Sequence, residues 1–537
     1  MRPPMTTFKT AISMPRLLSR ALTVCLVAGS VNLAAARDGD VRLPDIGSSA
    51  AALMSQSEQD DYGASVLREL RSYGIVLDDP LLNDYLYGLG HRLAAVSNRP
   101  DLKFTFFIVR DNEINAFAVP GGYIGVNAGL INVMRREDQL AGVVGHEIAH
   151  VTQQHLLRAY EDMRKASLPI ALAMIGAMIA TAGRSDDAAQ AALVSGTALI
   201  QQKQIDFTRS DETEADRFGI QALAKAGFDP HAMADAFTEL GRVMRVNGID
   251  VPEFLRTHPV DVNRIADAKA RADALETSST SRREQFSSLT PTKPISGGLL
   301  GAWKTPDIAV ATDGTSASND YYLLMRERSR VLAAESAQKM AAYYSKNFRD
   351  NSAFDTTANR YGYALALTRA DQAAKARDEL MKLTEANPGQ PVFQLALAQA
   401  MEINGERVAA EKRFEGLQQN YPGNRVYALA LANALIARGD AVPARRAQSL
   451  LRPLLENYAN DPDLQRSFAR ASELSGDKVR AAEAYADVAW LNGRAEDAIG
   501  QLQALAAKSE LDYYQRARID ARIAQMTPQV LELRRRG

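Results

Sequence analysis

The chain has a single cysteine, Cys25, among its 537 residues. This scarcity excludes an intrachain disulfide framework and any zinc site built from cysteines. The chain also lacks a clear excess of positive or negative charge, because it has 63 basic and 64 acidic residues and a formal net charge of −1. Nucleic-acid-binding proteins usually carry a basic surface that meets the phosphate backbone. We therefore expect no nucleic-acid partner.

Long hydrophobic runs and histidines are scarce as well. The apolar segment 168–182 has about 15 residues, fewer than the roughly 20 that span a bilayer. We expect a buried helix there; a hairpin in peripheral contact with a membrane, or a span, are the alternatives. The six histidines, at positions 91, 146, 150, 155, 231 and 258, all lie in the first half. Any histidine chemistry is therefore confined to that half.

The first 36 residues have the pattern of a cleaved signal peptide. Basic residues as far as Arg20 precede the apolar run 21–33, and three alanines follow at 34–36. A membrane anchor and lipid attachment at Cys25 are the alternatives. Cleavage would remove four positive charges and no negative ones, so the mature chain would carry −1 − 4 = −5. We predict an exported protein with a Gly/Ser/Ala-rich tether at residues 37–55.

The next 220 or so residues mix helices with a few strands. Helical patterns cover about 56–74 and 79–97, and the aromatic and β-branched run 103–109 indicates a strand. Residues 115–126 predict two short strands around the turn Pro120–Gly122. The pattern from 127 to about 270 is helical. We predict a domain over 56–274, followed by a Ser/Thr/Pro/Gly-rich linker without helical period over 275–320.

The second half carries an internal repeat. Pro388 and Pro422 lie 34 residues apart, and so do Gly405 and Gly439. This period with paired helices is typical of tetratricopeptide repeats, here over 321–537. The repeats start near residues 357, 391, 425 and 462, and Ala398, Ala410 and Phe414 occupy their packing positions. A generic alanine-rich bundle is the alternative. Stacked repeats form a groove suited to segments of another protein.

The clearest chemical signal is the sequence His146-Glu147-Ile148-Ala149-His150. Residues four apart share a helix face, so both imidazoles can reach one Zn²⁺ while Glu147 faces its open position as general base. Because histidine is rare in this chain, the motif is a strong signal. Ligand histidines must be neutral, so we predict that zinc affinity falls below about pH 6.5.

A third zinc ligand is expected downstream, in residues 211–216. Asp211 is available for the helix cap and three carboxylates compete for the position, against the alternative of an acid-rich helix N-terminus. Spacing favours Glu212, because Asp216 then lies one turn further along and can orient a ligand histidine. Glu214 is expected to be solvated. His91, His155 and His231 have no partner spacing and are expected to be structural or exposed.

Together these motifs carry a family resemblance. His146–His150, Glu212–Asp216, Thr257-His258-Pro259 and the segment 115–122 resemble the zinc metallopeptidases that include the CAAX prenyl proteases and HtpX. Export and the repeats make the chain most similar to the bacterial β-barrel assembly-enhancing proteases, over nearly all of its mature length. The expected fold is mainly α: a zincin-like α+β metallopeptidase domain with a small sheet, followed by a helical tetratricopeptide-repeat solenoid.

The resemblance also implies roles and partners. It implies one Zn²⁺ on His146, His150 and Glu212, and it supports His258 at the active site as a plug or as an oxyanion donor, against the alternative of a surface-loop histidine. It further implies a periplasmic location, outer-membrane β-barrel substrates and contact with the β-barrel assembly machinery. The strand around Ala116–Ala118 can pair with substrate by edge addition, or it is a plain core strand. The competing hypothesis is a periplasmic chaperone or adaptor that works through the repeat groove while its zinc site is latent.

Overall fold

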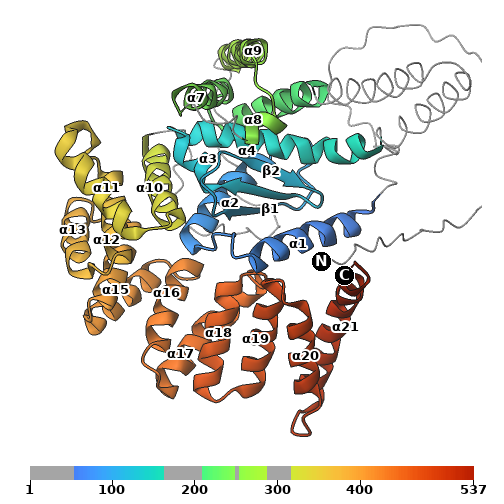
Figure 1. Ribbon diagram of the computed structural model, residues 1–537, viewed down its shortest axis with the longest axis vertical. Coiled ribbons are helices and arrows are strands. Elements are labelled where there is room, and N and C mark those ends of the chain that lie inside the picture. The colour runs from blue at the N-terminus through green and yellow to red at the C-terminus, as the bar shows by residue number, and fades with distance from the viewer. Residues whose placement is uncertain (1–53, 162–208, 248–252, 287–315, 537) are drawn as a thin grey trace, which may run out of the picture. The chain divides into compact units, whose positions relative to one another are not determined.

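The structure is a computed structural model, and it describes residues 54–161, 209–247, 253–286 and 316–536 (Figure 1). The expected signal peptide, nearly all of the tether and the apolar segment 168–182 lie outside these residues. Among the helices that are described, none combines the length and the apolar character that a membrane crossing needs.

Two capped helices open the first half of the chain. Helix α1 (Gln56–Ser72) begins after Ser55, whose hydroxyl accepts a hydrogen bond from the Glu58 amide while the Glu58 carboxylate accepts one from the Ser55 amide. Helix α2 (Pro80–Ala94) has proline at its first position and Asp79 as its cap. Both begin within one residue of their expected starts.

A three-stranded sheet follows α2. Strand β1 (Thr105–Val109) pairs in parallel with β3 (Tyr123–Asn127), and β2 (Ala116–Val119) pairs antiparallel with β3. The order β1-β3-β2 leaves β2 at an edge of the described sheet. The turn between β2 and β3 requires glycine, because Gly122 has φ +77° and a Cβ there would lie 2.1 Å from the Lys103 carbonyl oxygen.

The helices after the sheet bring the two sequence motifs together. Helix α3 (Ala128–Val133) leads into α4 (Glu137–Thr152), which packs on α2 and β2 (Figure 1). Residues 209–226 are also helical, and they cross α4 where Gly145 meets Gly219. A Cβ on Gly219 would lie 3.2 Å from the Gly145 carbonyl carbon. Two glycines therefore allow the helix of His146 and the helix of Glu212 to approach closely.

Three further helices complete this half: α7 (Ala232–Asn247), α8 (Glu253–Thr257) and α9 (Val262–Phe286). The expectation of a non-helical segment from 275 to 320 was wrong at both ends, because α9 continues to Phe286 and α10 begins at Ser316. Serine and threonine lower helix propensity by less than about 0.7 kcal/mol each, so a run without proline or glycine does not end a helix.

Paired helices make up the second half. After α10 (Ser316–Ala333), α11 (Ala337–Asp350) and the short η2 (Ser352–Phe354), the pairs run to the end of the described chain. They are α12 (Thr357–Arg369) with α13 (Ala373–Ala386), α14 (Pro391–Ile403) with α15 (Arg407–Asn420), α16 (Arg425–Ile436) with α17 (Ala441–Leu451), α18 (Pro462–Ser475) with α19 (Lys478–Leu491), and α20 (Ala495–Ala506) with α21 (Tyr513–Arg536).

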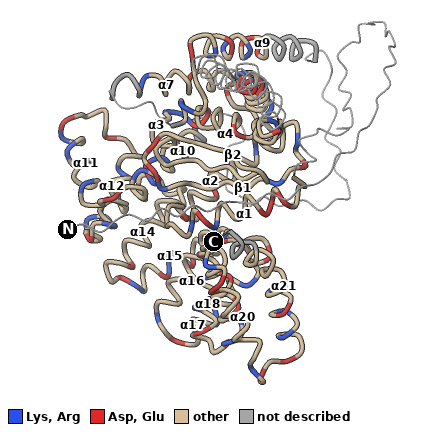
Figure 2. The backbone as a smooth tube through the Cα atoms, turned by 45° about the vertical axis from the view of Figure 1, so that its right-hand side comes forward, with Lys and Arg blue, Asp and Glu red and all other residues tan. Residues whose placement is uncertain are grey.

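Four of these pairs begin at 357, 391, 425 and 462, as the repeat period predicted. The extra 3-10 turn η3 (Arg452–Glu456) accounts for the last, longer spacing. Ala398, Ala410 and Phe414 are buried where neighbouring helices pack. Figure 2 shows basic and acidic residues interspersed along these helices, so the charge balance of the composition also holds locally.

The repeats also contact α2 through charged pairs. Arg328 on α10 donates to both carboxylate oxygens of Asp79, at 2.7 Å each, and Arg425 on α16 pairs with Asp84. Arg328 and Arg425 are both 7% exposed. Breaking a buried pair is strongly destabilising, so these contacts hold α10 and α16 against α2 and the first half.

Candidate active site

Helix α4 carries the first three residues of the site. His146 and His150 lie one turn apart, and their Nε2 atoms are 3.0 Å from each other. Glu147 lies between them in the sequence and is 1% exposed. The apolar residues Leu140, Val143, Val144 and Ile148 bury the helix around these side chains, each at most 1% exposed. Both imidazoles therefore point toward one position beside the rigid, buried helix α4.

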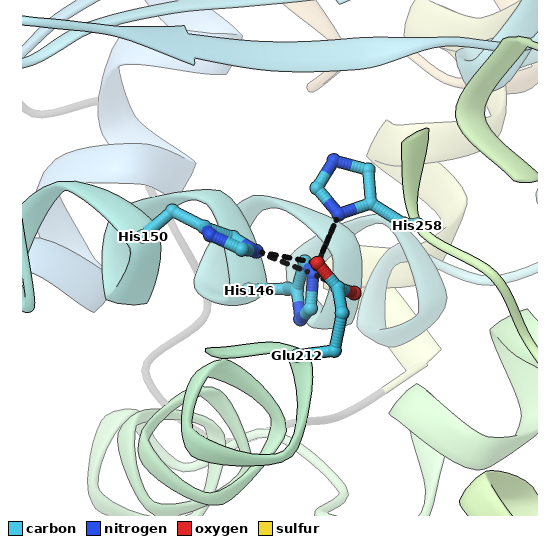
Figure 3. A group of neighbouring side chains, drawn as sticks. All are labelled: His146, His150, Glu212 and His258. Atoms are coloured by element: carbon cyan, nitrogen blue, oxygen red, sulfur yellow. Dashed lines mark hydrogen bonds and ion pairs between the residues drawn. The ribbon is translucent and has the colours of Figure 1, made fainter. Parts of the chain in front are cut away.

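The helical residues 209–226 supply two carboxylates. Glu212 places its oxygens 3.3 Å from the Nε2 atoms of both histidines, and Figure 3 shows the three groups converging. Asp216 lies one turn further along, with Oδ1 2.9 Å from Nδ1 of His146. A ligand histidine whose outer nitrogen faces a carboxylate is held in one tautomer, with its Nε2 lone pair turned inward.

His258 enters from the loop after α8. Its Nδ1 lies 2.8 Å from Glu212 Oε1 and 3.3 Å from His146 Nε2, while its Nε2 lies 3.6 Å from Glu147 Oε1. The ligand atoms of His146, His150, Glu212 and His258 all lie within 4.8 Å of one another. The structure thus brings together all the site residues that the sequence pointed to.

Arg264 on α9 is a site residue that the sequence analysis missed. Its guanidinium contacts Asp216 at 2.6 and 2.8 Å and Glu212 at 2.7 Å, and it stacks on Phe237 at 4.6 Å. No motif marks it, since its partners are 48 and 52 residues upstream. The one available signal is its position, six residues after His258, at the start of a helix.

These contacts set the charge states of the site without a metal. Burial lowers the pKa of His146, but the facing Glu212 and Asp216 outweigh it and raise that pKa to about 9. Burial dominates at His150 and lowers its pKa to about 3. Burial also raises the pKa of Glu147. One proton on His146 therefore occupies the place where a cation would meet the carboxylate of Glu212.

The residues present fit a metal ion. Two imidazoles and a carboxylate with room for a fourth ligand are a donor set typical of catalytic zinc. Glu147 Oε1 is buried and, among the described residues, has no hydrogen-bond partner. Such an orphaned acceptor beside three converging ligands is placed to receive a proton from a water molecule.

A cleft of about 590 Å³ opens onto this cluster. It is lined by Glu147, His150 and His258 on one side and by the edge strand β2 on another, with apolar side chains such as Ile75 and Leu157. An extended peptide can therefore lie against β2 and reach the histidines.

The remaining histidines differ in their surroundings. His91 stacks on Tyr87, and His231 lies 2.9 Å from Asp273, as expected for structural or exposed residues. His155 is 4% exposed and contacts His150. The expectation that Glu214 is solvated was wrong: it is one-third exposed and paired with both His155 and Arg158.

Comparisons with known proteins agree with this geometry. The chain is 31% identical over 519 residues to the beta-barrel assembly-enhancing protease of Escherichia coli K12, covering 95% of this chain and 97% of that protein. The chain belongs to the beta-barrel assembly-enhancing protease family. The family model "Peptidase family M48" matches residues 80–272, which include the whole cluster. The chain is a metallopeptidase.

Other relatives match shorter parts. A Vibrio cholerae relative is 42% identical over 254 residues, so the chain spans about half (52%) of that relative's length. The mitochondrial metalloendopeptidase OMA1 of Schizosaccharomyces pombe is 32% identical over 174 residues, 32% of this chain and 48% of that protein. A crystal structure of yeast Tom70 aligns with 70% of this chain and 96% of its own, at 11% identity and a TM-score of 0.16.

Proposed function

We propose that the chain is a periplasmic zinc endopeptidase that cleaves misassembled outer-membrane β-barrel proteins. The observation that carries the proposal is the convergence of His146, His150 and Glu212 within 4.8 Å, beside Glu147, whose Oε1 has no hydrogen-bond partner among the described residues. The name of the Escherichia coli relative supports the substrate class. The signal-like segment 1–36 supports export.

The chain's own groups divide the chemistry among them. His146, His150 and Glu212 would hold one zinc ion. When bound, that ion would supply a Lewis acid and a bound water molecule whose pKa falls to about 7. Glu147 takes the proton of the attacking water and passes it to the leaving amine nitrogen. Its burial favours both steps, because a raised pKa makes the carboxylate a better base near neutral pH.

The edge strand β2 would orient the substrate. Its residues line the cleft and its side away from β3 has no neighbouring strand in the described sheet, so an extended chain can add to it as a further strand. A β-barrel protein that has failed to assemble exposes extended, alternating apolar segments, which suit an apolar cleft beside a strand edge. The repeats would bind the substrate or the assembly machinery outside the cleft.

His258 would close the site at rest. Its Nδ1 lies within 3.3 Å of both Glu212 and His146, beside the atoms that would hold the metal. From that place it blocks the position that the attacking water needs. Activity then requires the loop of His258 to move aside.

The test uses the zinc-loaded full chain and an unfolded β-barrel protein as substrate. Glu147→Gln should keep its zinc and lose about 10²–10⁴-fold in cleavage rate, the usual contribution of a general base. His231→Gln, remote from the cluster, serves as the matched control and should cleave at the wild-type rate. His258→Ala should cleave faster than wild type. Undiminished cleavage by Glu147→Gln with zinc bound would refute the mechanism.

A further inference from the structure

His155 lies at the far side of the zinc site and takes no part in the mechanism above. Its Nδ1 is 2.8 Å from Nδ1 of His150, and the two rings meet nearly at right angles, at 82°. Its other nitrogen, Nε2, lies 3.1 Å from Glu214 Oε2. The ring therefore bridges a ligand histidine and a carboxylate nearer the surface.

The position of His155 depends on a break in the helix. Five residues along an uninterrupted helix turn by about 140°, so His155 would point away from His150. Helix α4 ends at Thr152, Gln154 takes the left-handed conformation with φ +56°, and the helix resumes at 155. This conformation is unfavourable by about 1–2 kcal/mol for a residue other than glycine. It turns His155 back onto His150.

The hydrogen-bond chemistry then allows one arrangement of protons. An ionised Glu214 only accepts, so Nε2 of His155 must carry the hydrogen that faces it. Nδ1 of a neutral His155 is then a lone pair and accepts the Nδ1–H of His150. That leaves the Nε2 lone pair of His150 directed at the point it shares with His146 and Glu212.

A second group of possible metal ligands consists of His155, Asp211 and Glu214, whose ligand atoms lie within 4.8 Å of one another. However, Arg158 already lies 3.1 Å from Asp211 Oδ1 and 2.5 Å from Glu214 Oε2. The guanidinium supplies the positive charge that the carboxylates need, and a second cation there would be repelled. The cluster is therefore suited to hold His155 and not to bind a metal.

We propose that His155 is a positioning residue that fixes the tautomer and orientation of His150 for zinc, as Asp216 does for His146. The proposal rests on the proposed zinc function and adds a link from His150 through His155 to Glu214 and Arg158. Groups that orient ligand histidines in this way typically contribute 10–100-fold to metal affinity.

Two amide substitutions test the roles of Nδ1 and Nε2 of His155 separately. Asparagine branches at the same carbon as the imidazole, so in His155→Asn the amide can place its oxygen where Nδ1 was and still accept from His150. The longer His155→Gln reaches the position of Nε2, keeps contact with Glu214 and loses the acceptor for His150. His231→Gln is the matched control for removing a histidine far from the site.

The measurement is the zinc Kd of each full-length chain by chelator competition, together with the visible spectrum of the Co²⁺-loaded chain. We expect His155→Asn to bind zinc within about threefold of wild type, and His155→Gln to bind about 10–100-fold more weakly with an altered Co²⁺ spectrum. Glu214→Ala, at a partly exposed residue, should weaken binding by a smaller factor.

The outcomes are distinguishable. Equal Kd values for wild type, His155→Gln and Glu214→Ala would overturn the positioning role and leave the zinc function standing. Equal losses in His155→Asn and His155→Gln would also overturn it, because packing alone would then explain both. A wild-type chain that binds no zinc would refute the proposed function itself. Glu214→Ala keeps the test valid if a substitution at buried His155 prevents folding.

Discussion

Arg264→Ala should destabilise the metal-free chain far more than the zinc-loaded one. In the metal-free site, the carboxylates of Glu212 and Asp216 are balanced by Arg264 and by the proton that His146 holds, given its pKa of about 9. Removing Arg264 leaves one uncompensated negative charge among groups that are at most 5% exposed. Breaking a buried pair in this way costs about 3–5 kcal/mol.

Bound zinc would change this balance of charges in the site. The ion replaces the proton of His146 with two positive charges, so without Arg264 the site holds Zn²⁺ against Glu212 and Asp216, and Glu147, whose pKa burial raises, takes up a proton and keeps the site neutral. For a unit of 150–250 residues, each kcal/mol shifts Tm by about 2–4 °C. We therefore expect Arg264→Ala to lower the Tm of the catalytic half by roughly 6–20 °C in chelator and by clearly less in excess zinc.

The assay is thermal unfolding of the full chain in chelator and in excess zinc. Arg271→Ala is the matched control, since it removes a guanidinium from the same helix, where the partner is Asp267 in a pair that is about a third to a half exposed. Such pairs contribute about 0–1 kcal/mol. If both variants shift Tm equally, or if Arg264→Ala shifts it equally with and without zinc, the reasoning is wrong.

Two more predictions concern the proton on His146 and the contact between the halves. Zinc must displace that proton, so wild-type zinc affinity should fall about tenfold for each pH unit below about 9, well above the 6.5 expected from an ordinary histidine; affinities that do not change between pH 6 and 8 would contradict this. Arg425→Ala leaves Asp84 and Asp461 unpaired and should cost about 3–5 kcal/mol in unfolding free energy. Arg446→Ala is the control, because Arg446 pairs with Glu415 in a more exposed contact, and it should cost about 0–1 kcal/mol. If chemical denaturation gives equal losses of unfolding free energy for the two variants, the Arg425 contact does not hold the two halves together.

Features encoded by local spacing were predictable from the sequence. His146 and His150 lie four residues apart on a helix, and that spacing alone places both Nε2 atoms together. The repeat starts were equally readable, because proline and glycine at a period of 34 mark where each pair of helices turns. Glu212 needed the family resemblance as well, since Asp211 and Glu214 stand within two residues of it.

Features that depend on a conformational exception or on distant contacts were not predictable. His155 meets His150 only because Gln154 departs from helical geometry, and no residue type at 154 signals that departure. Arg264 and Arg425 find their partners across 48 and 341 residues, and the sequence shows only ordinary charged helix positions there. The extension of α9 was missed because its serines and threonines suggested a linker.

The unequal support of the two ligand histidines has an electrostatic reason. With zinc bound, Glu212 and Asp216 against Arg264 and Zn²⁺ leave one positive charge in the buried site, which an ionised Glu147 neutralises. A carboxylate in direct contact with His150 would add a third negative charge and raise the pKa of Glu147 beyond the effect of burial. Glu147 would then be protonated before it could act as a base. The neutral ring of His155 avoids this, because it orients His150 while Glu214, with its charge, stays at the surface beside Arg158.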